Sequence, residues 1–378
     1  MSSVICSVRF SGRLTACLRQ SALLLAVLLT PSPVVGSPQT GEGQTAREGD
    51  LVKLAENVYA QIVSPDGNAV GNSGVVVLDH SVLVFDTHFT PEGAEALLSK
   101  IRTLTPKPVR YVVNSHFHPD HTHGNQVFSS AQIIGSYNAR RDILQKDLPA
   151  LNRTVATAQS QLERLRKDAA SPGTGAAVKE QLRTQIAARQ ELLDRMSRLK
   201  IIPPVLILDD RLLIREDARA VELRFVGAGH TDGDIVLYLP AEKILFLGDL
   251  FFNAALPNTQ DANLLEWIKT LEQILKIDAV KFVPGHGSPG TAKDVREFLG
   301  YLEELKALVQ PAVTRGDSME QILRDMQVPV KFSSYRFQNF FQANVQEMYV
   351  ELRALQLASQ AGQPPERAKK KEPDKPNP

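Results

Sequence analysis

The stretch YVVNSHFHPDHTHGN, residues 111–125, places four of the chain's eight histidines, together with an aspartate, within eight consecutive positions. The residues just before the histidines are rich in valine and predict a buried strand. We therefore expect the histidines to lie in a loop at the C-terminal end of that strand. Loops held at strand ends often carry binding and catalytic residues.

The spacing of these side chains is H-x-H-x-D-H. Alternate residues of an extended segment share a face, so His116 and His118 can bind one metal ion. A turn at Pro119 would direct Asp120 and His121 toward a second ion. Two ions roughly 3.5–4 Å apart are typically bridged by water or hydroxide.

Two metal ions need further ligands, and candidates occur where later strands are predicted to end. His230 lies in GAGHTDGD, Asp249 in FLGDLFF and His286 in VPGHGSPG. Glycines beside all three allow sharp turns and close approach of the backbone. Such a set has no packing explanation, because buried imidazoles and carboxylates without partners are costly. Five histidines and two aspartates suit zinc and also tolerate iron or manganese.

The composition fits a globular protein, with 43% hydrophobic and 22% charged residues. Residues 1–36 combine three arginines, no acid, the apolar run ALLLAVLLT and small residues, which predicts a signal peptide and a periplasmic or secreted protein. The apolar run is too short to span a bilayer, so we expect no stable membrane anchor.

Both cysteines, Cys6 and Cys17, lie in this leader, so the mature chain would have no disulfide and no thiolate ligand. Three of the 43 basic residues and none of the 42 acidic ones lie there as well, which leaves a mature chain close to neutral. We therefore expect no nucleic-acid partner.

Short β-branched runs between residues 51 and 88 predict strands, and PEGAEALLSKIRTL predicts a helix with Thr90 as its N-cap and Pro91 in its first position. Four more apolar runs between residues 211 and 249 predict strands, and they are followed by a helix in NLLEWIKTLEQILK, a strand in AVKFVPG and a helix in AKDVREFLGYLEELKALV. This alternation predicts an α/β sandwich. Further helices are expected over residues 311–360 and a disordered basic tail over residues 361–378.

Residues 138–200 have a different pattern. Apolar residues from Leu148 to Leu165 recur every three or four positions, and the spacing resumes after SPGTG. The pattern predicts an antiparallel helical hairpin inserted into the domain. The hairpin could cover the site, pair two copies into a homodimer, or be a solvated decoration of the core.

The motifs together resemble the metallo-β-lactamase fold superfamily. They appear in the family's order over residues 51–310: Asp86 after SVLVFD, the H-x-H-x-D-H loop, His230, Asp249 and His286. The resemblance implies an αββα sandwich with the site at the edge between the two sheets. It implies one zinc ion on His116, His118 and His230, a second on Asp120, His121 and His286, and a bridging Asp249. Asp86 would orient the ligand loop, and His123 and Asn125 could lie behind the ligands, whereas His80 and His88 are expected to have no part in the site.

Asp249 stands where many zinc β-lactamases have cysteine, so the resemblance is to members with a bridging aspartate, such as glyoxalase II, lactonases, alkylsulfatases and quinoprotein relay-type metallohydrolases. It implies attack by metal-bound hydroxide on a small-molecule ester, lactone, lactam, thioester or sulfate ester, with Asp120 taking the proton. A phosphodiesterase or nuclease of the same superfamily and a metal-binding accessory protein of low turnover are the alternatives. Near the C-terminus, Lys331, Tyr335 and Arg336 could form a basic anion-binding wall or simply pack a helix.

Overall fold

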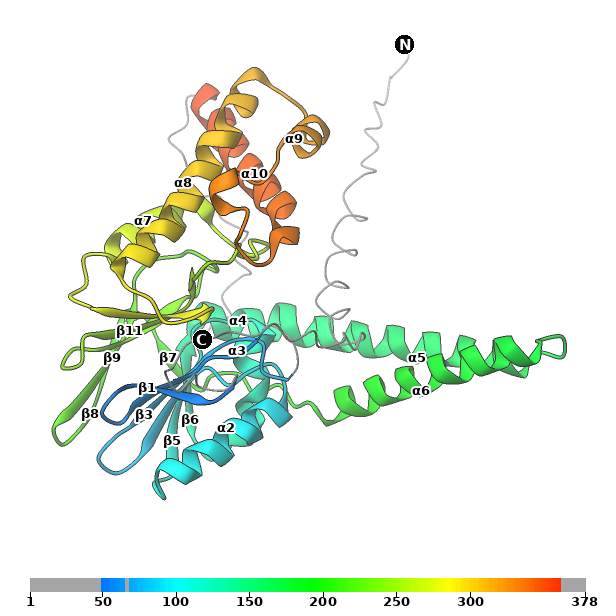
Figure 1. Ribbon diagram of the computed structural model, residues 1–378, viewed down its shortest axis with the longest axis horizontal. Coiled ribbons are helices and arrows are strands. Elements are labelled where there is room, and N and C mark those ends of the chain that lie inside the picture. Colours follow the sequence, from blue (N-terminus) through cyan, green and yellow to red (C-terminus); the bar gives the residue numbers. More distant parts are fainter. Residues whose placement is uncertain (1–48, 65–67, 362–378) are drawn as a thin grey trace, which may run out of the picture.

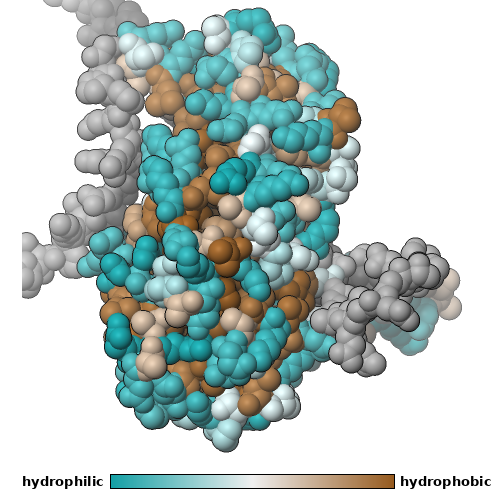
Figure 2. Space-filling model, turned by 60° about the vertical axis from the view of Figure 1, so that its left-hand side comes forward, coloured by the Kyte–Doolittle hydropathy of each residue, from teal (hydrophilic) through white to brown (hydrophobic). Residues whose placement is uncertain are grey.

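The computed structural model describes residues 49–64 and 68–361. The predicted signal peptide, and the predicted tail beyond residue 361, lie outside these residues. No described helix combines the length and the apolar character needed to cross a membrane. Hydrophilic side chains cover most of the face drawn in Figure 2, with apolar ones between them.

Strands of the described chain form two sheets. The first sheet has seven strands in the order β1 to β7, antiparallel from β1 to β4 and parallel from β4 to β7. Its strands are β1 (Leu51–Ala55), β2 (Val58–Gln61), β3 (Ser73–Val77), β4 (Val82–Phe85), β5 (Val109–Val113), β6 (Gln132–Ser136) and β7 (Leu206–Leu208). All residues of β3 and β4 are buried, as expected for central strands covered on both faces.

The second sheet has five strands in the order β12-β11-β10-β9-β8 among the described residues. The pair β11 and β12 is parallel, and the other pairs are antiparallel. Its strands are β8 (Arg211–Glu216), β9 (Arg219–Phe225), β10 (Ile235–Leu239), β11 (Ile244–Phe252) and β12 (Lys281–His286).

Three apolar layers hold the sandwich together. Side chains of both sheets, among them Phe85 and Phe246, form the layer between the sheets. Helix α2 (Pro91–Leu104) packs on the outer face of the first sheet through Leu97 and Ile101. Helices α7 (Leu264–Ile274) and α8 (Ala292–Arg315) cover the second sheet. The predicted αββα sandwich is confirmed (Figure 1).

Helix α2 begins where the sequence predicts. The Thr90 side chain accepts a hydrogen bond from the Gly93 N–H, and Pro91 occupies the first helical position. These two residues satisfy or remove backbone donors that would otherwise lack partners at the helix start.

The predicted helical hairpin is also present. It comprises α4 (Tyr137–Asp142), the π-helical turn η3 (Ile143–Asp147), α5 (Leu148–Ala170) and α6 (Ala176–Arg198). Helices α5 and α6 project from the body as an antiparallel arm (Figure 1). Most of their side chains are exposed, and the fully buried ones are Ala158, Leu162 and Leu192.

The last part of the chain that the structure describes forms helices that pack on α7 and α8. These are α9 (Met319–Asp325) and α10 (Phe341–Gln360), with the 3₁₀ turns η4 (Val330–Phe332) and η5 (Gln338–Phe340) between them. Phe332 and Met348 are buried in the same core as Trp267 of α7. The second sheet is therefore covered by a thick helical layer.

Candidate metal centre

The structure brings all seven predicted ligands together in two adjoining groups. His116 and His118 follow β5. Asp120 and His121 lie on the short helix α3 (Pro119–Thr122), where the sequence had predicted only a turn. His230 lies between β9 and β10, and His286 is the last residue of β12. Each group has its potential ligand atoms within 4.8 Å of one another: His116, His118, His230 and Asp249 in the first, and Asp120, His121 and His286 in the second.

In the first group three imidazole nitrogens converge. The Nδ1 atom of His118 lies 3.0 Å from His116 Nε2 and 2.8 Å from His230 Nε2. His230 Nε2 is also 3.3 Å from Asp249 Oδ2. Three imidazole nitrogens that converge in this way could coordinate one divalent cation from the same side.

The second group is built around two carboxylates. Asp120 Oδ2 lies 3.2 Å from His286 Nε2 and 3.4 Å from His121 Nε2. Asp249 Oδ1 is 3.2 Å from His121 Nε2, and Asp249 Oδ2 is 3.4 Å from His286 Nε2. Asp249 therefore contacts histidines of both groups.

Partners behind the ligands fix which ring nitrogen faces the site. Asp86 Oδ2 lies 2.8 Å from His121 Nδ1, and Asp86 Oδ1 accepts a hydrogen bond from the Ser115 N–H at 2.7 Å. The Ser115 hydroxyl lies 2.9 Å from His116 Nδ1. These contacts leave the Nε2 atoms of both histidines for the centre, as ligand-orienting hydrogen bonds do in metal sites.

Two buried polar atoms without a hydrogen bond test whether the site fits a cation. Among the described residues, His121 Nε2 and Asp249 Oδ1 are buried and have no hydrogen-bond partner. Burying such atoms unsatisfied costs free energy, and a divalent ion among them would satisfy both. The donor set of imidazole and carboxylate fits zinc, and the residues present therefore fit a metal pair.

The electrostatics of the site favour deprotonated ligands in the first group. Burial lowers the pKa of His116 well below its ordinary value and that of His230 to about 3, which keeps both imidazoles neutral. His286 differs, because Asp249 and Asp120 outweigh its burial and raise its pKa to about 9. Burial also raises the pKa of Asp249, but His286 and His121 outweigh it and hold that pKa well below its ordinary value.

Asp249 differs from expectation in one respect. It was predicted to lie where a strand gives way to a loop, but β11 continues to Phe252. The parallel register with β12 shifts on both sides of Gly248, which has a φ of 52° in the left-handed region. This irregularity, and not a strand end, turns the Asp249 side chain toward the site.

Comparison with known proteins agrees with this geometry. Residues 66–286 match the family model of the metallo-beta-lactamase superfamily. The chain belongs to this superfamily. A metallo-beta-lactamase from Pontibacter korlensis has the same fold, with a TM-score of 0.50 and 20% identity over 67% of this chain and 98% of that protein.

Two curated relatives of the superfamily differ in how much of the chain they match. A linear primary-alkylsulfatase from Pseudomonas sp. (strain ATCC 19151) is 23% identical over 265 residues, which is 67% of this chain. A type 2 metallo-beta-lactamase from Bacteroides fragilis is 34% identical over 86 residues, or 21% of this chain. The chain spans 49% of the length of the first relative and 34% of the second.

The remaining histidines lie outside the ligand set of this superfamily member. His80 is exposed and lies 2.9 Å from Asp217. His88 is buried and bonded to the Gly71 carbonyl oxygen at 2.8 Å. His123 is buried behind the loop, 3.1 Å from Asp147, and Asn125 exchanges amide hydrogen bonds with Asn114.

Sequence reasoning missed Asp261, which the structure places beside a predicted ligand. Its Oδ2 atom lies 3.3 Å from His118 Nε2, and its Oδ1 atom accepts a hydrogen bond from Lys146 at 2.7 Å. Asp261 lies in PNTQDANLL, which contains no motif, and only the predicted proximity to a helix start could have drawn attention to it.

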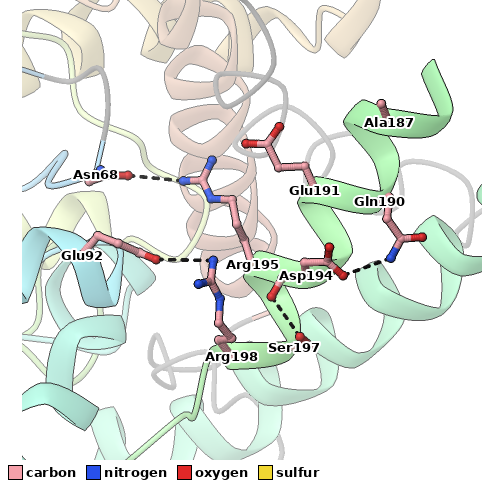
Figure 3. A pocket seen from close by; sticks show the side chains of 9 residues that line it. All are labelled: Asn68, Glu92, Ala187, Gln190, Glu191, Asp194, Arg195, Ser197 and Arg198. Carbon is pink, nitrogen blue, oxygen red and sulfur yellow. Dashed lines mark hydrogen bonds and ion pairs between the residues drawn. The ribbon is translucent and has the colours of Figure 1, made fainter. Parts of the chain in front are cut away.

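A groove of about 890 Å³ lies away from the metal ligands, where α6 meets the body (Figure 3). Arg195 donates to Asn68 Oδ1 at 3.3 Å, and Arg198 lies 3.8 Å from Glu92. Arg195 and Arg198 of α6 thus contact the body across the groove, and the residues that line it are not among the candidate metal ligands.

Proposed function

We propose that this chain is a dinuclear metal-dependent hydrolase. The convergence of five histidines and two aspartates in two groups that share Asp249 carries the proposal. His116, His118 and His230 would hold one ion, Asp120, His121 and His286 the other, with Asp249 between them. Two zinc ions would supply a bound hydroxide that is nucleophilic at neutral pH, and would polarise the substrate oxygen.

Asp120 is the residue of the chain best placed to accept a proton. Its side chain is 12% exposed, so it lies at the open side of a largely buried cluster. Burial raises the pKa of Asp120, but His121 and His286 outweigh that effect and hold the pKa well below its ordinary value. The carboxylate is therefore ionised at neutral pH and can accept a hydrogen bond from the attacking water, which a proton acceptor requires.

Sulfate esters with an apolar group are the substrates we propose first. The alkylsulfatase aligns with 67% of the chain, whereas the Bacteroides β-lactamase aligns with 21%. Beside the second ligand group, the Phe337 ring lies 6.0 Å from the His286 ring, and the exposed Arg336 lies next to it with its guanidinium 5.4 Å from the Phe337 ring. An aromatic side chain and a cation would suit an apolar ester that carries an anionic group.

The segment with Arg336 and Phe337 is held tightly against the site. Ala255 and Arg336 form an isolated bridge, and the neighbouring residues Ala254 and Phe337 have φ values of 52° and 60°. Such strained conformations persist where the surroundings impose them, often at functional sites. Lys331 and Tyr335 contact Phe332 instead, which favours the packing alternative for those two residues.

The test compares zinc-loaded and chelator-treated protein on four substrates: a medium-chain alkyl sulfate, an activated carboxylic ester, a chromogenic cephalosporin and a phosphodiester. We expect chelator-sensitive hydrolysis of the alkyl sulfate, lost in His118→Ala and kept in the surface variant His80→Ala. Two bound metals without turnover of any substrate would favour the accessory protein of low turnover. Cleavage of the phosphodiester alone would favour the phosphodiesterase alternative.

We also propose a location and partners for the chain. The pattern of residues 1–36 supports export to the periplasm or beyond, which cell fractionation would test. We propose a small-molecule substrate and no nucleic-acid partner. The homodimer through the hairpin stays a prediction, which light scattering of the full chain would test.

A further inference from the structure

The segment that connects the first sheet to the arm, residues 137–147, is called the arm base below and consists of α4 and η3. An ion-paired chain runs from it to a candidate metal ligand. Lys146 Nζ lies 2.7 Å from Asp142 Oδ2 and donates to Asp261 Oδ1 at 2.7 Å. Asp261 Oδ2 then lies 3.3 Å from His118 Nε2.

This chain of contacts determines which nitrogen of His118 faces the centre. A hydrogen bond from Nε2–H to Asp261 leaves the lone pair on Nδ1. Nδ1 is the atom that lies within 3.0 Å of His116 Nε2 and 2.8 Å of His230 Nε2. Fixing the tautomer of His118 therefore prepares the first ligand group.

Charge balance indicates that Lys146 serves this contact and not a substrate anion. Its ammonium lies between two carboxylates, one of which, on Asp142, is almost fully buried, with a side chain 2% exposed. It also lies 4.7 Å from the centre of the Phe117 ring.

The arm base also contacts the loop that carries His230, the third histidine of the first group. Arg141 donates to the Asp232 carboxylate at 2.8 Å, and the Asn138 side chain donates to the Asp232 carbonyl oxygen at 2.7 Å. Asp232 lies two residues after His230. π-Helical turns recur at functional sites, and η3 places Lys146 toward Asp261 and Asp147 toward His123.

We propose that Lys146 is a positioning residue for the first metal-binding group, acting through Asp261 on His118. The inference rests on the proposed dinuclear centre. Lys146 lies in the arm base and outside the five family motifs, so the inference gives the inserted arm a role in metal binding.

The test measures zinc binding by full-length Lys146→Met in competition with a chromophoric chelator. Lys167→Met, an exposed lysine on α5, is the matched control. Loss of a partner behind a ligand typically weakens metal binding about 10-fold to 100-fold. We expect that loss at one of two zinc sites in Lys146→Met, little change in Lys167→Met, and partial rescue in Lys146→Arg.

A second readout separates positioning from plain stability. The absorption spectrum of the cobalt-substituted protein should change in Lys146→Met and stay constant in the control, whatever happens to the melting temperature. If Lys146→Met does not fold, Asp261→Asn removes the partner of Lys146 from the other side and should weaken the same zinc site.

Two outcomes are distinguishable. Wild-type zinc affinities and an unchanged cobalt spectrum in the Lys146 and Asp261 variants would overturn this inference and leave the proposed function standing. Failure of the wild-type chain to bind zinc at all would overturn the proposed function and this inference with it.

Discussion

Gly285 shows how closely the backbone approaches the candidate centre at the scale of one residue. A Cβ atom added there would lie 1.8 Å from Asp249 Oδ1, a distance at which the carboxylate must move. At Gly248 an added Cβ would lie 2.5 Å from the Ser115 Cβ. Both glycines are therefore required by the ligands and the ligand-orienting residues around them.

Gly285→Ala should displace the carboxylate that both ligand groups share. We expect loss of at least one bound metal ion and of most hydrolytic activity, measured by elemental analysis and turnover. The matched control is Gly173→Ala near the tip of the arm, where nothing lies within 4 Å of an added Cβ. Full metal content in Gly285→Ala would contradict the placement of Asp249.

The H-x-H-x-D-H loop was predictable from sequence because its four ligands are neighbours in the chain. Asp261 was not, because its partners His118 and Lys146 are 143 and 115 residues away and a single aspartate carries no pattern. The position of Asp249 inside β11 could not be predicted either, since it depends on a register shift against β12.

Helix α2 and the arm illustrate what periodicity and capping residues predict at the scale of an element. Thr90 caps α2 as expected, and its hydroxyl also donates to the Asn68 carbonyl oxygen at 3.0 Å. Periodicity predicted α5 and α6 as well. It could not predict the π-helical turn η3, which depends on contacts with distant residues.

Thr90→Ala should remove the N-cap of α2 without touching the metal ligands. We expect a loss of about 1 kcal/mol in the free energy of unfolding, measured by chemical denaturation, with metal content unchanged. Thr184→Ala on the exposed face of α6 should have a smaller effect. Equal effects of the two substitutions would argue against the cap.

Shortening the arm at its tip should leave the centre intact, because Asn138, Arg141 and Lys146 of the arm base make the contacts described above and lie far from the tip. Replacing residues 163–189 by a short glycine-rich linker removes the distal, largely exposed turns of α5 and α6 and leaves the arm base unchanged. We expect wild-type metal content and a melting temperature within a few degrees of wild type. Loss of metal would show that the distal arm also supports the site.

At the scale of the whole molecule, two sheets and their helices carry ligands from widely separated positions to one place. His116 and His286 are 170 residues apart in sequence, yet both belong to the centre. The fold class could be predicted because the alternation of strands and helices and the five motifs agree. The sequence predicted helices in the region of α9 and α10. It did not predict their packing on α7, because that packing depends on tertiary contacts.

Metal removal should destabilise the folded chain as a whole. A ligand that binds only the folded state at 100 times its dissociation constant contributes about 2.7 kcal/mol. We therefore expect chelation to lower the melting temperature and zinc to restore it, as measured by calorimetry. In a double variant His116→Ala with His286→Ala, added zinc should no longer raise the melting temperature.

The most direct test of the dinuclear centre is the metal content of the purified full-length protein, determined by elemental analysis after zinc reconstitution. The geometry predicts two metal ions per wild-type chain, two in His80→Ala, and fewer than two in Asp249→Ala, because Asp249 touches both ligand groups. One ion or fewer in the wild type, or two in Asp249→Ala, would contradict the assignment.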